Sequence, residues 1–183
     1  MPTFAALNND KKMKKLFLAG AVALFGFASA QTTNAALAKG KWVIEANTGS
    51  HATGNTSFGL TSVDGANTTS WNLGVDGGYF VMDKLAIKAG LGYGETGVDG
   101  VEGNFVYKVG AQYYIINQIP VGVDFTGTSS DGDNANWVGF EGGYAWFVAP
   151  NIAVTPKLRY NLTLDENKAP SAFQGLIGFS LFF

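Results

Sequence analysis

The sequence contains no cysteine, few charges and no long apolar run. The absence of cysteine excludes disulfide bonds and thiolate metal sites. Only 14% of the 183 residues are charged, and the net charge of −2 gives no indication of nucleic-acid binding. Glycine and aromatic residues are abundant instead, with 25 glycines and 14% aromatic residues. This composition suits one domain and fits a two-faced sheet better than a helical protein.

The first 30 residues have the features of an export signal. Lysines cluster between residues 11 and 15, an apolar stretch follows at 16–27, and Ala28-Ser29-Ala30 forms a small-residue cleavage site. The alternative is a membrane anchor, but this stretch is shorter than the roughly 20 residues that a spanning helix needs. We take Met13 as the natural start. The chain then divides into an upstream extension, a signal peptide, a periplasmic lead and a β-domain, at residues 1–12, 13–30, 31–40 and 41–183.

The last eleven residues, FQGLIGFSLFF, alternate in character. Every second position counted back from Phe183 is apolar or glycine, whereas the positions between them are smaller and more polar in the middle of the stretch. A period of two indicates a strand with two unlike faces. An apolar final strand that ends on an aromatic residue is expected where the surrounding solvent is lipid.

Eight alternating segments can be counted after residue 40. Their lengths are close to the roughly 9–11 residues that a tilted strand needs to cross a membrane. The connections between them alternate between long polar loops and short turns, which is typical of an outer-membrane barrel with both termini on the periplasmic side. The segments are 41–49, 69–80, 85–94, 104–115, 120–127, 136–147, 152–162 and 173–183.

One face of all eight segments is predicted to be free of charge and to contact lipid. A Lys or Arg on that face at mid-depth would cost about 2–4 kcal/mol, which explains why the face lacks them. Aromatic residues on this face gather near the two ends of the segments, as in the aromatic girdles of membrane proteins. The alternative is a soluble periplasmic barrel of the lipocalin kind, with its apolar side chains inside. The predicted girdle residues are Trp42, Trp71, Tyr79, Tyr93, Tyr107, Tyr113, Tyr144, Trp146 and Tyr160.

The opposite face carries four acids and four bases. The interior of an eight-stranded barrel is just wide enough for side chains to fill, so we expect these charges to be paired and the core to be closed. The alternative is that they line a wet channel. The eight residues are Glu45, Asp76, Lys88, Lys108, Asp124, Glu141, Lys157 and Arg159. The expected pairs are Asp76 with Lys88, Glu141 with Lys157, Lys108 with Asp124, and Arg159 with Glu45.

Taken together, the export signal, the eight segments, the charged interior and the terminal phenylalanine resemble the small OmpA/OmpX-type outer-membrane β-barrel proteins. The resemblance covers residues 41–183 and implies an eight-stranded antiparallel up-and-down transmembrane barrel in the bacterial outer membrane. It also implies insertion by the barrel-assembly machinery, which would read Phe179, Leu181 and Phe183 in the last strand. A monomer in outer-membrane lipid is expected, without cofactor, metal or nucleic acid. Pro156 departs from the pattern, because proline cannot donate to a strand ladder, and it predicts a bulge.

The family resemblance implies a structural or adhesive role, or one in envelope integrity, exerted through the outer loops. Two alternatives stay open: a narrow channel for small solutes, and a lipid A-modifying enzyme. The only histidine, His51, lies near Ser50, Ser57 and Asp64 in the first long loop, but this spacing is not diagnostic of a catalytic triad. The loop sequence Asp131-Gly132-Asp133-Asn134 lacks the full calcium-loop pattern and reads better as a turn. We therefore expect no enzymatic activity.

Overall fold

The structure is a computed structural model that describes residues 34–63, 68–98, 100–130 and 133–183. The predicted signal peptide and the first three residues of the predicted lead lie outside the described residues. Within the described part of the chain, no helix is both long enough and apolar enough to cross a membrane.

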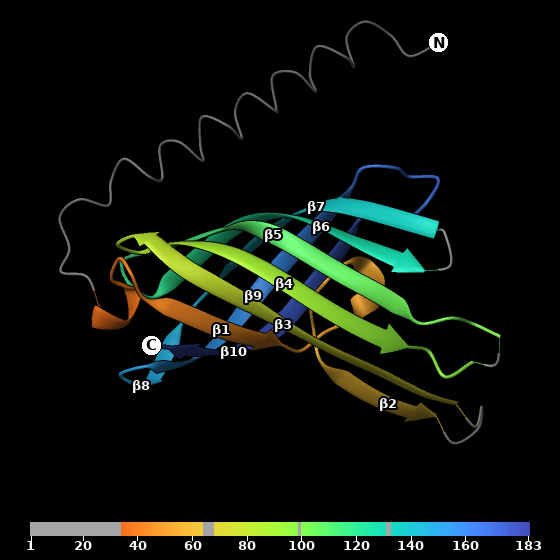
Figure 1. Ribbon diagram of the computed structural model, residues 1–183, viewed down its shortest axis with the longest axis horizontal. Helices are drawn as coiled ribbons and strands as arrows, with labels where there is room; N and C mark the ends of the chain where they lie inside the picture. The colour runs from red at the N-terminus through yellow and green to blue at the C-terminus, as the bar shows by residue number, and fades with distance from the viewer. Residues whose placement is uncertain (1–33, 64–67, 99, 131–132) are drawn as a thin grey trace, which may run out of the picture. The chain divides into compact units, whose positions relative to one another are not determined.

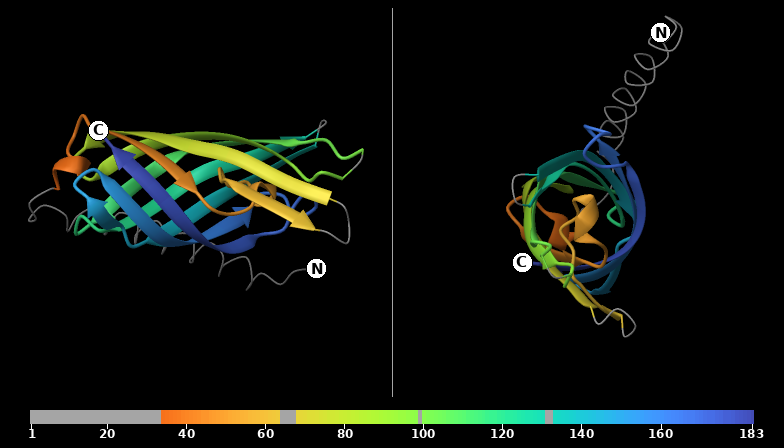
Figure 2. Two further views of the ribbon diagram at one scale, coloured as in Figure 1. Left: turned by 90° about the horizontal axis from the view of Figure 1, so that it is seen from below. Right: turned by 90° about the vertical axis from the view of Figure 1, so that its right-hand side faces the viewer.

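The strands form one antiparallel sheet that closes on itself. The wall runs β1-β3-β4-β5-β6-β7-β9-β10, and β1 pairs with both β10 and β3, so that the sheet has no free edge at this level (Figure 1). The view along the axis shows the closed ring (Figure 2). This confirms the predicted all-β, eight-stranded up-and-down barrel. The wall strands are β1 (Trp42–Asn47), β3 (Thr68–Met82), β4 (Leu85–Glu95), β5 (Asn104–Ile115), β6 (Ile119–Ser130), β7 (Asp133–Gly143), β9 (Ile152–Thr163) and β10 (Ala172–Phe182).

Two further strands lie off this path. The short β8 (Trp146–Ala149) continues the line of β7 beside β9. The other, β2 (Gly59–Val63), pairs with the outer end of β3 and forms a hairpin in a stretch that the sequence predicts as loop. We call the end of the barrel that carries this hairpin the long-loop end, and the opposite end the short-turn end.

The prediction of a bulge at Pro156 is wrong. The irregularity is a break between β7 and β8, on the strand beside Pro156. β9 runs through Pro156 without interruption, and the register on either side is the same, with Gly143 opposite Lys157 and Trp146 opposite Val154. The irregularity falls on the neighbouring strand instead. The backbone N–H of Tyr144 donates to the carbonyl of Pro156 over 3.1 Å, but proline has no N–H to return the bond, so the ladder is interrupted there.

The apolar face of the wall points outward. Leu73, Leu91 and Leu158 are among its most exposed members, and the opposite face contains the charged residues. Tyr113 differs from the expectation. It belongs to the outward set but is only 6% exposed, at a position flanked by its register partners Leu85 and Val121.

The short-turn end of the interior is filled by apolar side chains. Here Phe80, Tyr114 and Phe182 lie with ring centroids 6.1 to 6.3 Å apart. A short 3-10 helix, η1 (Ala35–Leu37), covers this end, and the carbonyl of Leu37 accepts a hydrogen bond from the turn residue Lys84. The residues expected as a polar lead are therefore partly folded against the barrel, and Leu37 is fully buried. We call this cluster the aromatic floor.

Candidate functional site inside the barrel

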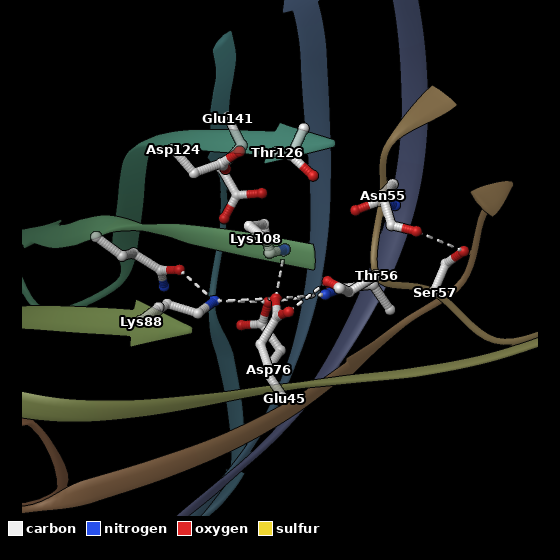
Figure 3. Close-up of polar contacts among 12 residues, drawn as sticks. Glu45, Asn55, Thr56, Ser57, Asp76, Lys88, Lys108, Asp124, Thr126 and Glu141 are labelled. Atoms are coloured by element: carbon white, nitrogen blue, oxygen red, sulfur yellow. Dashed lines mark hydrogen bonds and ion pairs between the residues drawn. The ribbon is translucent and has the colours of Figure 1, made fainter. Parts of the chain in front are cut away.

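The eight charged side chains predicted to face inward lie together in the interior. They form one continuous path of seven ion pairs in which acid and base alternate. No side chain of the path is more than 9% exposed. Figure 3 shows part of it. In order, the path runs through Lys108, Asp76, Lys88, Glu45, Lys157, Glu141, Arg159 and Asp124.

Two of the four expected pairs are present. Lys88 lies 3.7 Å from Asp76, and Lys157 lies 3.7 Å from Glu141. Both are the longest contacts of the path. The stronger contact of Lys157 is to Glu45, at 2.6 Å, and this pair ties β9 to β1.

The other two expected pairs are wrong. Lys108 pairs with Asp76 at 2.5 Å rather than with Asp124. Arg159 occupies the register position opposite Glu141 and binds Asp124 through both terminal nitrogens, each at 2.6 Å. A guanidinium fork suits a carboxylate in this bidentate way, whereas a lysine supplies a point charge that can reach across the lumen.

The two ends of the path, Lys108 and Asp124, lie on neighbouring strands. A small cavity separates them, lined also by Lys88, Gln112 and Glu141. It has room for about one water molecule, and its lining supplies the polar partners that a buried water needs. The Lys108–Asp124 contact expected from the sequence is thus replaced by a polar gap in an otherwise nearly closed ring of charges.

Glycines of the wall give the long side chains their space. A Cβ at Gly139 would collide with the guanidinium of Arg159 and approach Asp124, and a Cβ at Gly110 would collide with the backbone and side chain of Asp124. Close packing of side chain on backbone therefore explains glycine at these interior positions.

The segment after β1 folds into the barrel and fills its long-loop half. We call residues 50–57 the plug; they include the 3-10 helix η2 (His51–Thr53), which is visible inside the ring in Figure 2. Its hydroxyl at Thr56 donates to the carboxylate of Asp76, which links the plug directly to the charge path (Figure 3). At Gly54 the backbone has φ of +68° and lies against the ring of Trp137, a position that requires glycine for both reasons.

Other contacts hold the plug to the wall. Asn161 donates to the carbonyl of Thr53, and Thr126 donates to the carbonyl of Gly54. Among the described residues, several buried amide atoms at the same boundary have no hydrogen-bond partner, including both polar atoms of the Asn55 side chain. A buried unpaired polar group costs about 1–3 kcal/mol, so this boundary is held less firmly than the charge path below it.

The plug differs from the exposed loop that the sequence predicts for these residues. The available signal is that residues 48–63 contain no Asp, Glu, Lys or Arg, although they lie in a predicted polar loop. The charged side chains inside the barrel already pair with one another, so a loop without charge can enter without adding a charge that needs a partner. The glycine, serine and threonine of this stretch predict an exposed loop.

The histidine, serines and acid of the first long loop do not form a catalytic triad in the described residues. His51 is buried, and burial lowers the pKa of its imidazole, opposed by a hydrogen bond with Asn72. The hydroxyl of Ser57 donates to the carbonyl of Asn55, and Ser50 accepts from the backbone N–H of Ala52. Asp64 lies outside the described residues. So do Asp131 and Gly132, the first two residues of the loop considered for calcium. No cluster that could hold a metal is present in the part of the chain that the structure describes.

The predicted girdle and assembly residues lie mainly on the outer surface. Among the aromatic pairs, Trp42 packs on Tyr79 with ring centroids 4.9 Å apart. Tyr107 is half-buried and donates to Asn136, whereas Tyr113 is buried as described above. The girdle residues with exposed side chains are Trp42, Trp71, Tyr79, Tyr93, Tyr144, Trp146 and Tyr160. The exposed residues of the predicted assembly signal are Phe179, Leu181 and Phe183.

The apolar exterior, the charged interior and the eight-stranded closure define the fold of the small outer-membrane β-barrels. No family profile matches the chain, and no curated protein sequence matches it. Among solved structures, the N-terminal β-barrel domain of Pseudomonas aeruginosa OprF matches with a TM-score of 0.52 at 16% identity. The match covers 79% of this chain and 98% of that one. This likeness shows the fold, which is the one that the sequence resemblance implied.

Two further solved structures are more distant. The Yersinia pestis attachment invasion locus protein Ail matches with a TM-score of 0.41 at 14% identity, over 79% of this chain and 99% of that one. Neisserial surface protein A matches with a TM-score of 0.40 at 11% identity, and the match covers 79% of this chain and 94% of that one.

Proposed function

We propose that the chain is an outer-membrane protein whose barrel crosses the lipid with its apolar face outward. The observation that carries this is the division of the wall: the outward positions of the strands hold exposed side chains such as Leu91, Val109 and Leu158, whereas the charges are buried inside. In water this arrangement would expose a large apolar belt, which monomeric soluble proteins avoid. In lipid it is the stable orientation.

The filled interior favours a structural or adhesive role, or one in envelope integrity, over transport. The aromatic floor, the charge path and the plug follow one another along the axis, and each is built from buried side chains. What then remains available to a partner is the long-loop end. We propose that this end faces outward and that both termini face the periplasm.

The exposed apolar residues at the end of the last strand suit a signal for insertion into the membrane. Phe179 and Leu181 lie on the outer face of β10, next to the closing seam with β1, and Phe183 follows directly after β10 with its backbone hydrogen-bonded to Trp42. We propose that they form the signal for the barrel-assembly machinery. Replacing Phe183 with Ser should then reduce the amount of barrel in the outer membrane, whereas the same change at exposed Leu164, in the β9–β10 loop, should not.

Cell fractionation and gel mobility test the proposal together. The expressed protein should sediment with the outer membrane, and it should migrate differently in detergent gels before and after boiling, because a closed barrel resists unfolding until it is heated. Recovery of the exported protein dissolved in the periplasm, with the same mobility before and after boiling, would refute the proposal.

A further inference from the structure

The strand β2 has one paired edge and one free edge. It stands at the end of the sheet path, paired only with β3, in the described part of the chain. Beyond Asn47 the chain leaves the wall to form the plug, and β2 continues along β3 in its place. In Figure 2 the β2–β3 hairpin extends away from the ring of strands.

Hydrogen bonding decides which groups of β2 point to the free edge. The backbone N–H of Phe58 donates to the carbonyl of Asn47, away from β3. Backbone groups of successive residues in a strand point to opposite sides, so those of Leu60 and Ser62 also point away from β3. These two residues therefore present N–H and C=O groups in the spacing that an added antiparallel strand would use.

The edge lacks the features that normally prevent such pairing. Natural edge strands are commonly protected by a charge, a proline or a bulge. β2 has the sequence Gly-Leu-Thr-Ser-Val, which contains neither charge nor proline, and its register with β3 is regular over five residues. Leu60 is 75% exposed, the largest value among the large apolar side chains of the described residues. An unprotected edge with an exposed leucine is a binding surface for an extended segment.

Charge at this end of the barrel selects the occupant. Among the described residues, the segments that join strands there, counted with the residue at each strand end, hold five acids and one lysine: Glu95, Glu102, Asp133, Asp165, Glu166 and Lys168. Glu95 lies on β4, two strands from β2, in register with Trp71 of β3. Gly103 packs against the side chain of Glu95, so the neighbouring residue Glu102 lies close to Glu95. A second copy of the chain in the same membrane would bring two acidic ends together, and an acidic peptide would be repelled in the same way.

We propose that the free edge of β2 binds an extended, cationic segment of a partner protein as an added antiparallel strand. Backbone hydrogen bonds to Leu60 and Ser62 provide the pairing, the exposed side chain of Leu60 provides an apolar contact, and the surplus of acids attracts the positive charges. The inference rests on the proposed function, since it assigns the partner chemistry of the long-loop end.

The test uses the full barrel in nanodiscs of zwitterionic lipid and two labelled eight-residue peptides. One alternates lysine with valine and threonine, and the other is its twin with glutamate in place of lysine. Fluorescence anisotropy should show binding of the lysine peptide that weakens as salt is raised, and about tenfold weaker binding or none for the glutamate twin. Amide hydrogen exchange at Leu60 and Ser62 should slow when the lysine peptide is added.

A matched pair of variants isolates the edge. Ser62→Pro removes the N–H on the free side and leaves the ladder with β3 intact, so it should weaken binding about tenfold relative to Ser62→Ala, which retains that N–H. Equal binding of the two peptides, or of the two variants, would overturn the inference. A dimer of the wild-type barrel that Ser62→Pro dissociates would also overturn it, because the edge would then be occupied by a second copy.

The outcome also separates the inference from the proposed function. If the lysine peptide fails to bind while the protein fractionates with the outer membrane and shifts on boiling, only the assignment of a partner is wrong. If the protein is found dissolved in the periplasm, the proposed function fails whatever the peptides do.

Discussion

Arg159 is the residue on which the interior charges depend most. Its side chain is completely buried and holds two carboxylates, with Asp124 bound through both oxygens and Glu141 at 3.1 Å. Burying three charges is costly unless each is paired, and removal of one partner leaves the others uncompensated. The contribution of Arg159 to stability is therefore measured by replacing it with an uncharged residue.

Arg159→Met should lower the free energy of unfolding by about 3–5 kcal/mol, because Asp124 and Glu141 lose a buried partner. The midpoint of unfolding in guanidinium chloride, followed by the gel shift of the folded barrel, measures this. Lys168→Met, at an exposed loop position, is the control and should leave the midpoint unchanged. Equal midpoints for the two variants would contradict the buried pairing.

A pair of glycine variants tests how tightly the ring is packed. Gly139→Ala places a methyl group against Arg159 and should cost about 1–3 kcal/mol, the usual range for overpacking. Gly175→Ala is the matched change on the outer face, where no atom of the described residues other than its chain neighbours lies within 4 Å of the new Cβ, and it should be neutral. The same unfolding midpoints serve, and a neutral Gly139→Ala would show that the interior has more space than the structure indicates.

Among the elements inside the barrel, the plug is held less firmly than the charge path, because the buried side chain of Asn55 has no hydrogen-bond partner among the described residues. Burial lowers the pKa of His51 below its ordinary value of 6.5, with Asn72 opposing, so the packed plug favours the neutral imidazole. The resulting stability is fully present above pH 6.5 and is lost as the pH falls from there through the lowered pKa of the packed state. Acidification therefore favours a released plug.

The indole resonance of Trp137, which packs against Gly54, reports plug release in an NMR titration. It should shift as the pH falls below about 6.5 in the wild type and stay constant over the same range in His51→Gln. The same shift in both proteins would mean that another group controls the plug.

The plug is expected to pack the interior rather than to gate a pore. Replacing residues 50–57 with a short glycine-serine linker leaves the charge path and the aromatic floor in place, so conductance in planar bilayers should stay near that of the bare bilayer. Steady channels in this variant, absent from the wild type, would make the plug a gate and favour the channel alternative.

Most of the wall could be predicted from alternation, because a period of two assigns each side chain to one face. β5 begins and ends at the predicted residues, 104 and 115. The contacts of Lys108 with Asp76 and of Arg159 with Asp124 could not be predicted, since each skips a strand and strand-to-strand neighbours do not define contacts made across the lumen. The contact of Arg159 with Glu141, by contrast, joins register partners on neighbouring strands. The plug and β2 could not be predicted, because a stretch of Gly, Ser and Thr does not distinguish an exposed loop from one folded inward.

The molecule as a whole is a barrel with its apolar surface outward and its charges enclosed. The four tryptophans sample both sides of the wall. Trp42, Trp71 and Trp146 are exposed on the outer face, and Trp137 is only 1% exposed inside. They serve as native probes of which side faces the acyl chains.

The most direct measurement is the quenching of single-tryptophan variants by lipids brominated near the headgroup end of the acyl chain. Variants that retain only Trp42, Trp71 or Trp146, with phenylalanine at the other three positions, should be strongly quenched, and the variant that retains only Trp137 should not. Strong quenching of Trp137, or outer tryptophans that respond to aqueous iodide and not to brominated lipid, would contradict the account.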